Sequence, residues 1–131
     1  MIVLDTNALA WWLGGSPRLS AAARRAIARE QEAGGLAIAS VTLMELAHLL
    51  ARGEIRTGRT PLDWLRQVVE QTRVAVLDVT PEIAATAAFL PPTFPADPFD
   101  RLIAATAMAE KAPLVTSDAR IQDSGVVRTI W

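Results

Sequence analysis

The feature that most restricts how this 131-residue sequence can fold is an alternation of short apolar runs with longer segments of helical character. The runs are apolar throughout, which is typical of strands that are buried on both faces. Strands that alternate with helices favour a mainly parallel sheet covered by helices on both faces. The expected strands are Ile2–Leu4, Leu36–Ala39, Val74–Leu77, Leu114–Thr116 and Val126–Ile130.

The segments between the strands carry ordinary helix start and stop signals. Ser20 precedes a stretch rich in alanine and arginine that Gly34 ends, and Pro61 suits the first position of a helix. Asp97 opens a further helix after the prolines of 91–95, which avoid helical conformations. The expected helices are 8–13, 21–33, 41–52, 61–71, 81–90 and 99–111.

The length and composition fit one domain, residues 1–131, and they restrict the kinds of binding site that it can contain. With 13 basic and 14 acidic residues there is no overall basic field, so local basic groups or a metal must hold any polyanionic substrate. The absence of cysteine excludes disulfides and thiolate metal sites. No apolar run approaches the roughly 18 residues of a membrane span, and no charged leader precedes the first strand, so we expect a cytoplasmic protein without a membrane segment.

Two acids follow predicted strands, Asp5 after the first and Asp118 after the fourth. The carboxyl ends of parallel strands meet at one edge of the sheet, where ligands bind in open α/β folds. Each acid has a structural alternative, because Asp5, Thr6 or Asn7 can cap the next helix and Ser117-Asp118 is common in turns. We assign both acids to a site and the capping role mainly to Asn7.

Two further acids lie on predicted helices. Glu45 has mostly apolar neighbours three and four residues away, and a carboxylate on such a surface needs a partner or a metal ion. Asp97 and Asp100 lie three residues apart at a helix start, where capping is the alternative for both. We expect Asp97 mainly to cap the helix and Asp100 mainly to belong to the site.

If the four carboxylates of Asp5, Glu45, Asp100 and Asp118 converge, a cation must neutralise them, because like charges raise each other's pKa. Oxygen ligands without cysteine or a histidine cluster select Mg²⁺ or Mn²⁺ over Zn²⁺. Such an ion activates and orients a water, which suits hydrolysis of a phosphodiester. The sequence offers no other nucleophile paired with a base.

Several segments together resemble one known family. In their order and spacing they resemble the PIN-domain ribonucleases of the VapC toxin type, over essentially the whole chain. The resemblance implies a three-layer α/β/α sandwich around a four- to five-stranded, mainly parallel sheet, and a Mg²⁺- or Mn²⁺-dependent endoribonuclease. The family's four acids fall on Asp5, Glu45, Asp100 and Asp118. The segments that carry the likeness are Leu4–Leu13, Pro17–Ser20, Ser40 with Glu45, Asp97–Ala107 and Leu114–Asp118.

The same resemblance implies supporting residues and partners. Thr6, Asn7 and Thr116 or Ser117 would orient the carboxylates or the reacting water, although many members have histidine where this chain has Asn7. Toxins of this type usually form homodimers that act on RNA, and a small cognate antitoxin silences them by blocking the acidic groove with its C-terminal segment.

Other residues have less distinctive patterns. Arg101, next to Asp100, is a candidate contact to the RNA backbone. Arg18, Arg24 and Arg25 are further candidates, but for these three we favour the alternative of a solvated surface charge or an ion-pair partner. Stacking on bases or on antitoxin side chains is the alternative for Trp11 and Trp12, which we expect in the core or an interface. His48 is expected to be a packed or hydrogen-bonded core residue.

Three other functions fit parts of the pattern. A phosphotransfer receiver needs paired acids after its first strand and a lysine late in the chain at the end of a strand, whereas the only lysine here, Lys111, ends a helix. A phosphatase of the haloacid-dehalogenase type needs an aspartate where Asn7 stands. A PIN-like module that binds RNA or protein without cleaving it remains the alternative.

Overall fold

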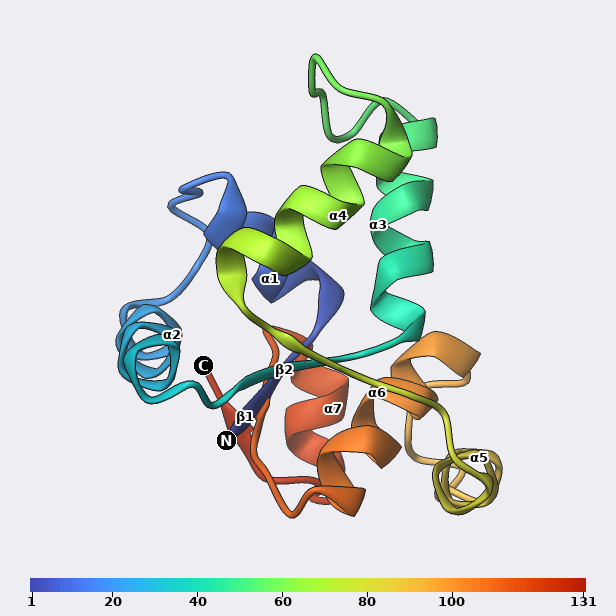
Figure 1. Ribbon diagram of the computed structural model, residues 1–131. Coiled ribbons are helices and arrows are strands. Elements are labelled where there is room, and N and C mark those ends of the chain that lie inside the picture. Colours follow the sequence, from blue (N-terminus) through green and yellow to red (C-terminus); the bar gives the residue numbers. More distant parts are fainter.

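The computed structural model describes residues 1–131 and arranges them around one sheet (Figure 1). Five strands pair in the order β3-β2-β1-β4-β5, and every pairing is parallel. The first strand of the chain therefore lies at the centre. The strands are β1 Ile2–Leu4, β2 Leu36–Ala39, β3 Ala75–Leu77, β4 Leu114–Val115 and β5 Thr129–Ile130.

Helices cover both faces of the sheet, which confirms the predicted three-layer α/β/α sandwich (Figure 1). Side chains alternate across β1, so that Ile2 and Leu4 enter a core with α1 to α4, whereas Val3 enters a second core with α6 and α7. Helix α5 packs against α6. The helices are α1 Thr6–Leu13, α2 Ala21–Ala33, α3 Val41–Ala51, α4 Pro61–Thr72, α5 Pro81–Ala88, α6 Pro98–Ala109 and α7 Ala119–Ser124.

The predicted elements are present, with differences near the sheet edge. Sequence reasoning missed α7, a helix of six residues between its N-cap Asp118 and its C-cap Gly125. The predicted fifth strand, Val126–Ile130, is shortened to β5, and α1 begins at Thr6, earlier than predicted. No helix combines the length and the apolar character that crossing a membrane would require.

The position of β1 creates a crevice at one edge of the sheet. The chain winds from β1 to β2 and β3 on one side, then returns to β4 and β5 on the other. A reversal of strand order of this kind leaves a binding crevice at the carboxyl ends of the strands. Leu4 lies opposite Val115, and the Asp5 amide donates a hydrogen bond to the Val115 carbonyl at 3.1 Å. The segments that follow β1 and β4 therefore start next to each other.

Small residues let α6 lie close to the sheet. Ala104 and Ala107 of the helix and Ala37 and Ala39 of β2 are fully buried in the same core. Because α6 carries Asp100 in its first turn, this close contact sets how near that acid comes to the carboxyl end of β1.

A larger side chain at this contact should be poorly tolerated. We expect Ala104→Leu to lower the free energy of unfolding by roughly 1–3 kcal/mol, because a close-packed core must deform to admit it. Urea denaturation measures the change, and Ala109→Leu, at an exposed position of the same helix, is the matched control. Equal stability of the two variants would contradict this packing.

Candidate active site

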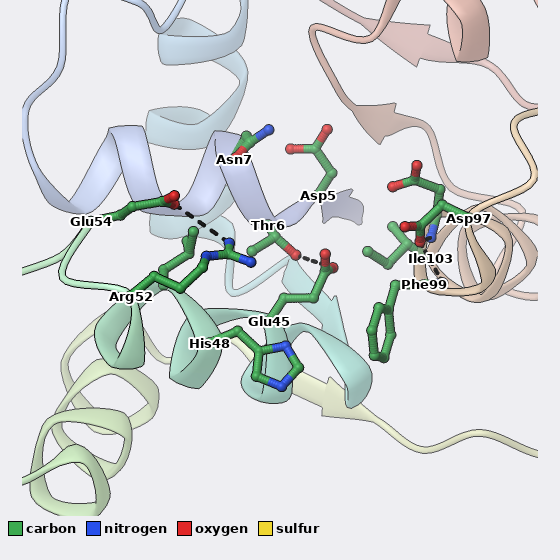
Figure 2. Close-up of a pocket in the computed structure, with 12 residues that line it drawn as sticks. Asp5, Thr6, Asn7, Glu45, His48, Arg52, Glu54, Asp97, Phe99 and Ile103 are labelled. Atoms are coloured by element: carbon green, nitrogen blue, oxygen red, sulfur yellow. Dashed lines mark hydrogen bonds and ion pairs between the residues drawn. The ribbon is translucent and has the colours of Figure 1, made fainter.

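A polar pocket of about 390 Å³ opens at the carboxyl end of β1 (Figure 2). Its walls come from the start of α1, one side of α3 with the loop that follows it, and the start of α6. Three of the four predicted site acids line it, and they come from three different elements. The lining residues are Asp5, Thr6, Asn7, Glu45, His48, Leu49, Arg52, Glu54, Asp97, Phe99, Asp100 and Ile103.

Asp5 caps a helix and faces the pocket at the same time. Its Oδ1 accepts a hydrogen bond from the Ala8 amide at 2.7 Å, which makes it the N-cap of α1. The predicted capping role of Asn7 is wrong, because Asn7 lies within the first turn and its side chain is exposed. Burial raises the pKa of Asp5 to about 6, although the Thr116 hydroxyl and the Ala8 amide act in the opposite direction.

Glu45 is oriented from across the pocket by Thr6. The buried Thr6 hydroxyl donates a hydrogen bond to Glu45 Oε1 at 2.6 Å and so connects α1 to α3 (Figure 2). Burial raises the pKa of Glu45, the Thr6 hydrogen bond opposes this rise, and the charge of Asp97 adds to it. The contact fixes the carboxylate at the side of the pocket that faces Asp5.

Asp97 and Asp100 divide capping and site roles at the start of α6. Oδ1 of Asp97 accepts hydrogen bonds from the amides of Phe99, at 2.8 Å, and Asp100, at 3.1 Å, which confirms its predicted capping role. Burial raises the pKa of half-buried Asp100 to about 6, and the four charges that raise it further are all acids. These acids are Asp97, Glu45, Asp118 and Asp5, in decreasing order of effect.

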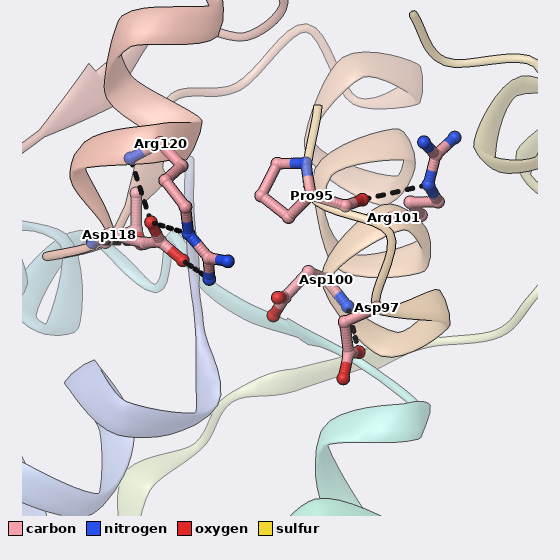
Figure 3. A network of polar contacts seen from close by, with 7 residues as sticks. Pro95, Asp97, Asp100, Arg101, Asp118 and Arg120 are labelled. Carbon is pink, nitrogen blue, oxygen red and sulfur yellow. Dashed lines mark hydrogen bonds and ion pairs between the residues drawn. The ribbon is translucent and has the colours of Figure 1, made fainter. Parts of the chain in front are cut away.

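Asp118 lies beyond the residues that line the pocket and is held by Arg120 (Figure 3). The Arg120 guanidinium donates hydrogen bonds to both carboxylate oxygens, to Oδ2 at 2.8 Å and to Oδ1 at 3.1 Å. This pairing lowers the pKa of Asp118. The carboxylate nevertheless adds to the raised pKa of Asp5 and of Asp100, so it belongs to the same electrostatic cluster.

The two small polar residues after β4 occupy different environments. The Thr116 hydroxyl is buried, accepts a hydrogen bond from the Asp118 amide at 3.1 Å, and lowers the pKa of Asp5. Ser117 is half-buried and does not line the pocket. Of the pair, Thr116 is therefore the residue that acts on the acidic cluster.

The chemistry of these donors fits a hard divalent cation. The acids are carboxylate oxygen donors, and the pKa values of Asp5 and Asp100 are raised first by burial and then by the negative charge of neighbouring acids. As the side chains stand, no group of three or more acids or histidines is arranged to hold an ion. Asp118 in particular has both carboxylate oxygens engaged by the Arg120 guanidinium.

Sequence reasoning missed two basic residues in the pocket, His48 and Arg52. The expectation that His48 is a core residue is wrong, because its side chain is exposed and its ring lies edge-on to Phe99, with centroids 6.4 Å apart. His48 lies three residues after Glu45 on α3, and Arg52, the C-cap of that helix, lies seven residues after Glu45, so both are on the same helix face. Their spacing from Glu45 is the sequence signal that could have placed both residues in the pocket.

Arg101 has a structural role that differs from the predicted RNA contact. Its guanidinium points away from the pocket and donates hydrogen bonds to four backbone carbonyls, at 2.9 to 3.4 Å (Figure 3). These four hydrogen bonds fix the end of α5 and the proline-rich loop before α6. The accepting carbonyls belong to Ala87, Leu90, Phe94 and Pro95.

The chain matches one known protein family and one relative over nearly its whole length. The model of the family described as the PIN domain matches residues 2–126. Ribonuclease VapC22 of Mycobacterium tuberculosis is 40% identical over 132 residues, which cover 99% of this chain and 98% of that protein.

Solved structures share the fold at lower identity. VapBC2 from Rickettsia felis, bound to a DNA fragment from its promoter, has a TM-score of 0.71 at 18% identity, covering 98% of this chain and 97% of that chain. FitAcB from Neisseria gonorrhoeae has a TM-score of 0.70 at 21% identity, covering 98% of this chain and 96% of that chain.

The raised pKa values predict how stability varies with pH when no divalent ion is present. Asp5 and Asp100 favour the protonated form in the folded protein, so their contribution is complete below the unfolded pKa of 3.8 and is lost as pH rises through about 6. In EDTA, the melting temperature should therefore fall between pH 5 and pH 7. Asp100→Asn should reduce this fall and raise stability at pH 7 by about 1 kcal/mol after allowance for solvent screening.

Differential scanning calorimetry measures both effects. Glu70→Gln, at an exposed position on α4, is the control and should melt as the wild type does. A wild-type melting temperature that rises from pH 5 to pH 7 in EDTA would contradict the assigned cause.

Proposed function

The chain belongs to the PIN-domain family, and from this membership and the geometry of the pocket we propose that it is an endoribonuclease that acts as the toxin of a toxin–antitoxin pair. It hydrolyses RNA phosphodiester bonds with a divalent metal ion, and the whole chain, residues 1–131, forms its nuclease domain. The observation that carries the proposal is the meeting of Asp5, Glu45 and Asp100 in one pocket at the carboxyl end of β1. The likeness to Ribonuclease VapC22 supports RNA as the substrate.

In this proposal Asp5, Glu45, Asp100 and Asp118 hold Mg²⁺ or Mn²⁺. Such an ion, when bound, would lower the pKa of the water that acts as the nucleophile and would neutralise negative charge on the phosphate. The oxygen-only donors and their mutual repulsion support this choice of metal.

The neighbouring residues orient the acids. Thr6 donates a hydrogen bond to Glu45, and the Ala8 amide fixes one oxygen of Asp5. The Thr116 hydroxyl favours the ionised form of Asp5, which is the form that binds a cation. Asn7 lies at the exposed edge of the pocket, where it can contact substrate, and Ser117 lies half-buried directly before Asp118.

We also propose a cognate small antitoxin as the protein partner, and a homodimer as the assembled toxin. Structures described as VapBC and FitAcB assemblies, and a toxin–antitoxin complex from Klebsiella pneumoniae, share the fold of this chain. An acidic pocket of this kind suits a basic side chain of an inhibitor as well as a metal ion.

One observation favours the alternative of a PIN-like module that binds RNA or protein without cleaving it. Asp118 is paired with Arg120, and no three acids are arranged to hold an ion as the side chains stand. If Arg120 keeps this position when RNA binds, the site lacks its fourth acid.

Cleavage of RNA by matched variants distinguishes the two functions. We expect wild-type protein to cleave RNA in Mg²⁺ or Mn²⁺ and to stop in EDTA, because the acids need a cation to act on a phosphate. Glu45→Gln should lower the rate by roughly 100-fold or more, since it removes a charged group of the site. Glu70→Gln, which makes the same chemical change at an exposed position of α4, should keep full activity.

Gel electrophoresis of a labelled RNA measures these rates. Equal cleavage by both glutamine variants, or cleavage that persists in EDTA, would rule out the proposed mechanism. RNA binding without cleavage by the wild type would favour the alternative module.

A further inference from the structure

A second groove, of about 820 Å³, adjoins the acidic pocket. It lies between α1 and α4 and is bordered by the loop that follows α3. Asn7, Leu49 and Glu54 line both the pocket and the groove, so the two form one continuous surface. A polymer anchored in the pocket can therefore extend into the groove without leaving the protein.

The charges on the two sides of the pocket differ. The groove carries Arg18 and Arg56 against the single acid Glu54. Both arginines are exposed, and neither side chain donates a hydrogen bond or forms an ion pair within the chain, so their charges are available to a ligand. The other side of the pocket presents Asp97 and the cluster around Asp118. Electrostatics therefore favour the groove side for a polyanion.

Two tryptophans give the groove aromatic walls. Trp11 is already covered, with the Arg18 guanidinium 5.1 Å from its ring centroid and the Trp131 ring at 5.7 Å. This contact holds the Arg18 guanidinium at the edge of the groove. Trp64, half-buried on α4, packs with one part of its side chain against the core and lines the groove with the rest. Unlike Trp11 it has no aromatic or cationic partner, so the part of its ring that lines the groove can contact a planar ligand.

We propose that this groove binds the single-stranded RNA that continues from the acidic pocket, with Trp64 stacking on one base and Arg18 and Arg56 contacting phosphates. Aromatic surfaces combined with unpaired arginines are the usual means of holding single strands. The inference rests on the proposed function, because it assigns the groove to the same substrate. An apolar protein segment is the other possible occupant, but it would leave both arginine charges unmatched.

Binding to a cleavage-deficient protein tests the groove separately from catalysis. In the Asp100→Asn background with EDTA, we measure fluorescence anisotropy of a short labelled oligouridylate. Adding Trp64→Leu should weaken binding by roughly 5- to 150-fold, the range for loss of one stacked base. Adding Arg18→Ala and Arg56→Ala together should reduce the slope of log affinity against log salt by about 1.4, because two phosphate contacts are lost.

Arg25→Ala with Arg128→Ala removes the same charge from exposed positions outside both cavities and should leave the slope nearly unchanged. Thermal melting checks that Trp64→Leu remains folded. If this variant unfolds, the variant with Arg18→Ala and Arg56→Ala decides whether the groove binds RNA. Unchanged binding in the arginine pair, or an equal loss in the control pair, would overturn the inference. Retained binding in the groove variants would leave the groove to a protein segment. A wild type that binds RNA through the groove but cleaves none would instead refute only the proposed function.

Discussion

The site depends on the electrostatic cost of placing Asp5 and Asp100 where water is partly excluded and most nearby charges are acids. Burial is the largest cause of the raised pKa of both groups, and mutual repulsion adds to it. An ionised carboxylate under these conditions destabilises the fold unless a cation balances it. Within the chain, the basic residue Arg52 at the edge of the pocket supplies part of such a balancing charge.

The fold brings the acids together through contacts that are themselves ordinary. Asp5 arrives as the cap of α1, and Asp100 arrives one turn after the cap of α6. Thr6 connects α1 to α3, and alanines let α6 approach the sheet. Arg101 fixes the loop that leads into α6. The reversal of strand order at β1 is what makes these separate contacts converge on one crevice.

Much of this could be predicted from the sequence because the signals are local. Uniformly apolar runs predict buried parallel strands, and Ser20 and Asp97 predict the helix starts that the structure confirms. The predictions that are wrong concern residues whose roles depend on tertiary contacts. The sequence pattern assigns Asp5 to the site and Asn7 to the cap, whereas in the fold the Asp5 carboxylate caps α1 and lines the pocket as well.

The orientation of long side chains cannot be predicted from the sequence either, because it also depends on tertiary contacts. Arg101 neighbours an acid in sequence, yet its guanidinium points to four carbonyls on the far side of the helix start. The apolar neighbours of His48 predict a core residue, although its side chain lines the pocket. Whether Asp118 faces the cluster or Arg120 is a balance of rotamers that no spacing rule decides.

Direct binding of Mn²⁺ at neutral pH, measured by isothermal titration calorimetry, tests whether a cation completes this acidic cluster. We expect saturable binding by the wild type that weakens at least about tenfold in Asp100→Asn. Absence of binding, or equal binding by both proteins, would contradict it.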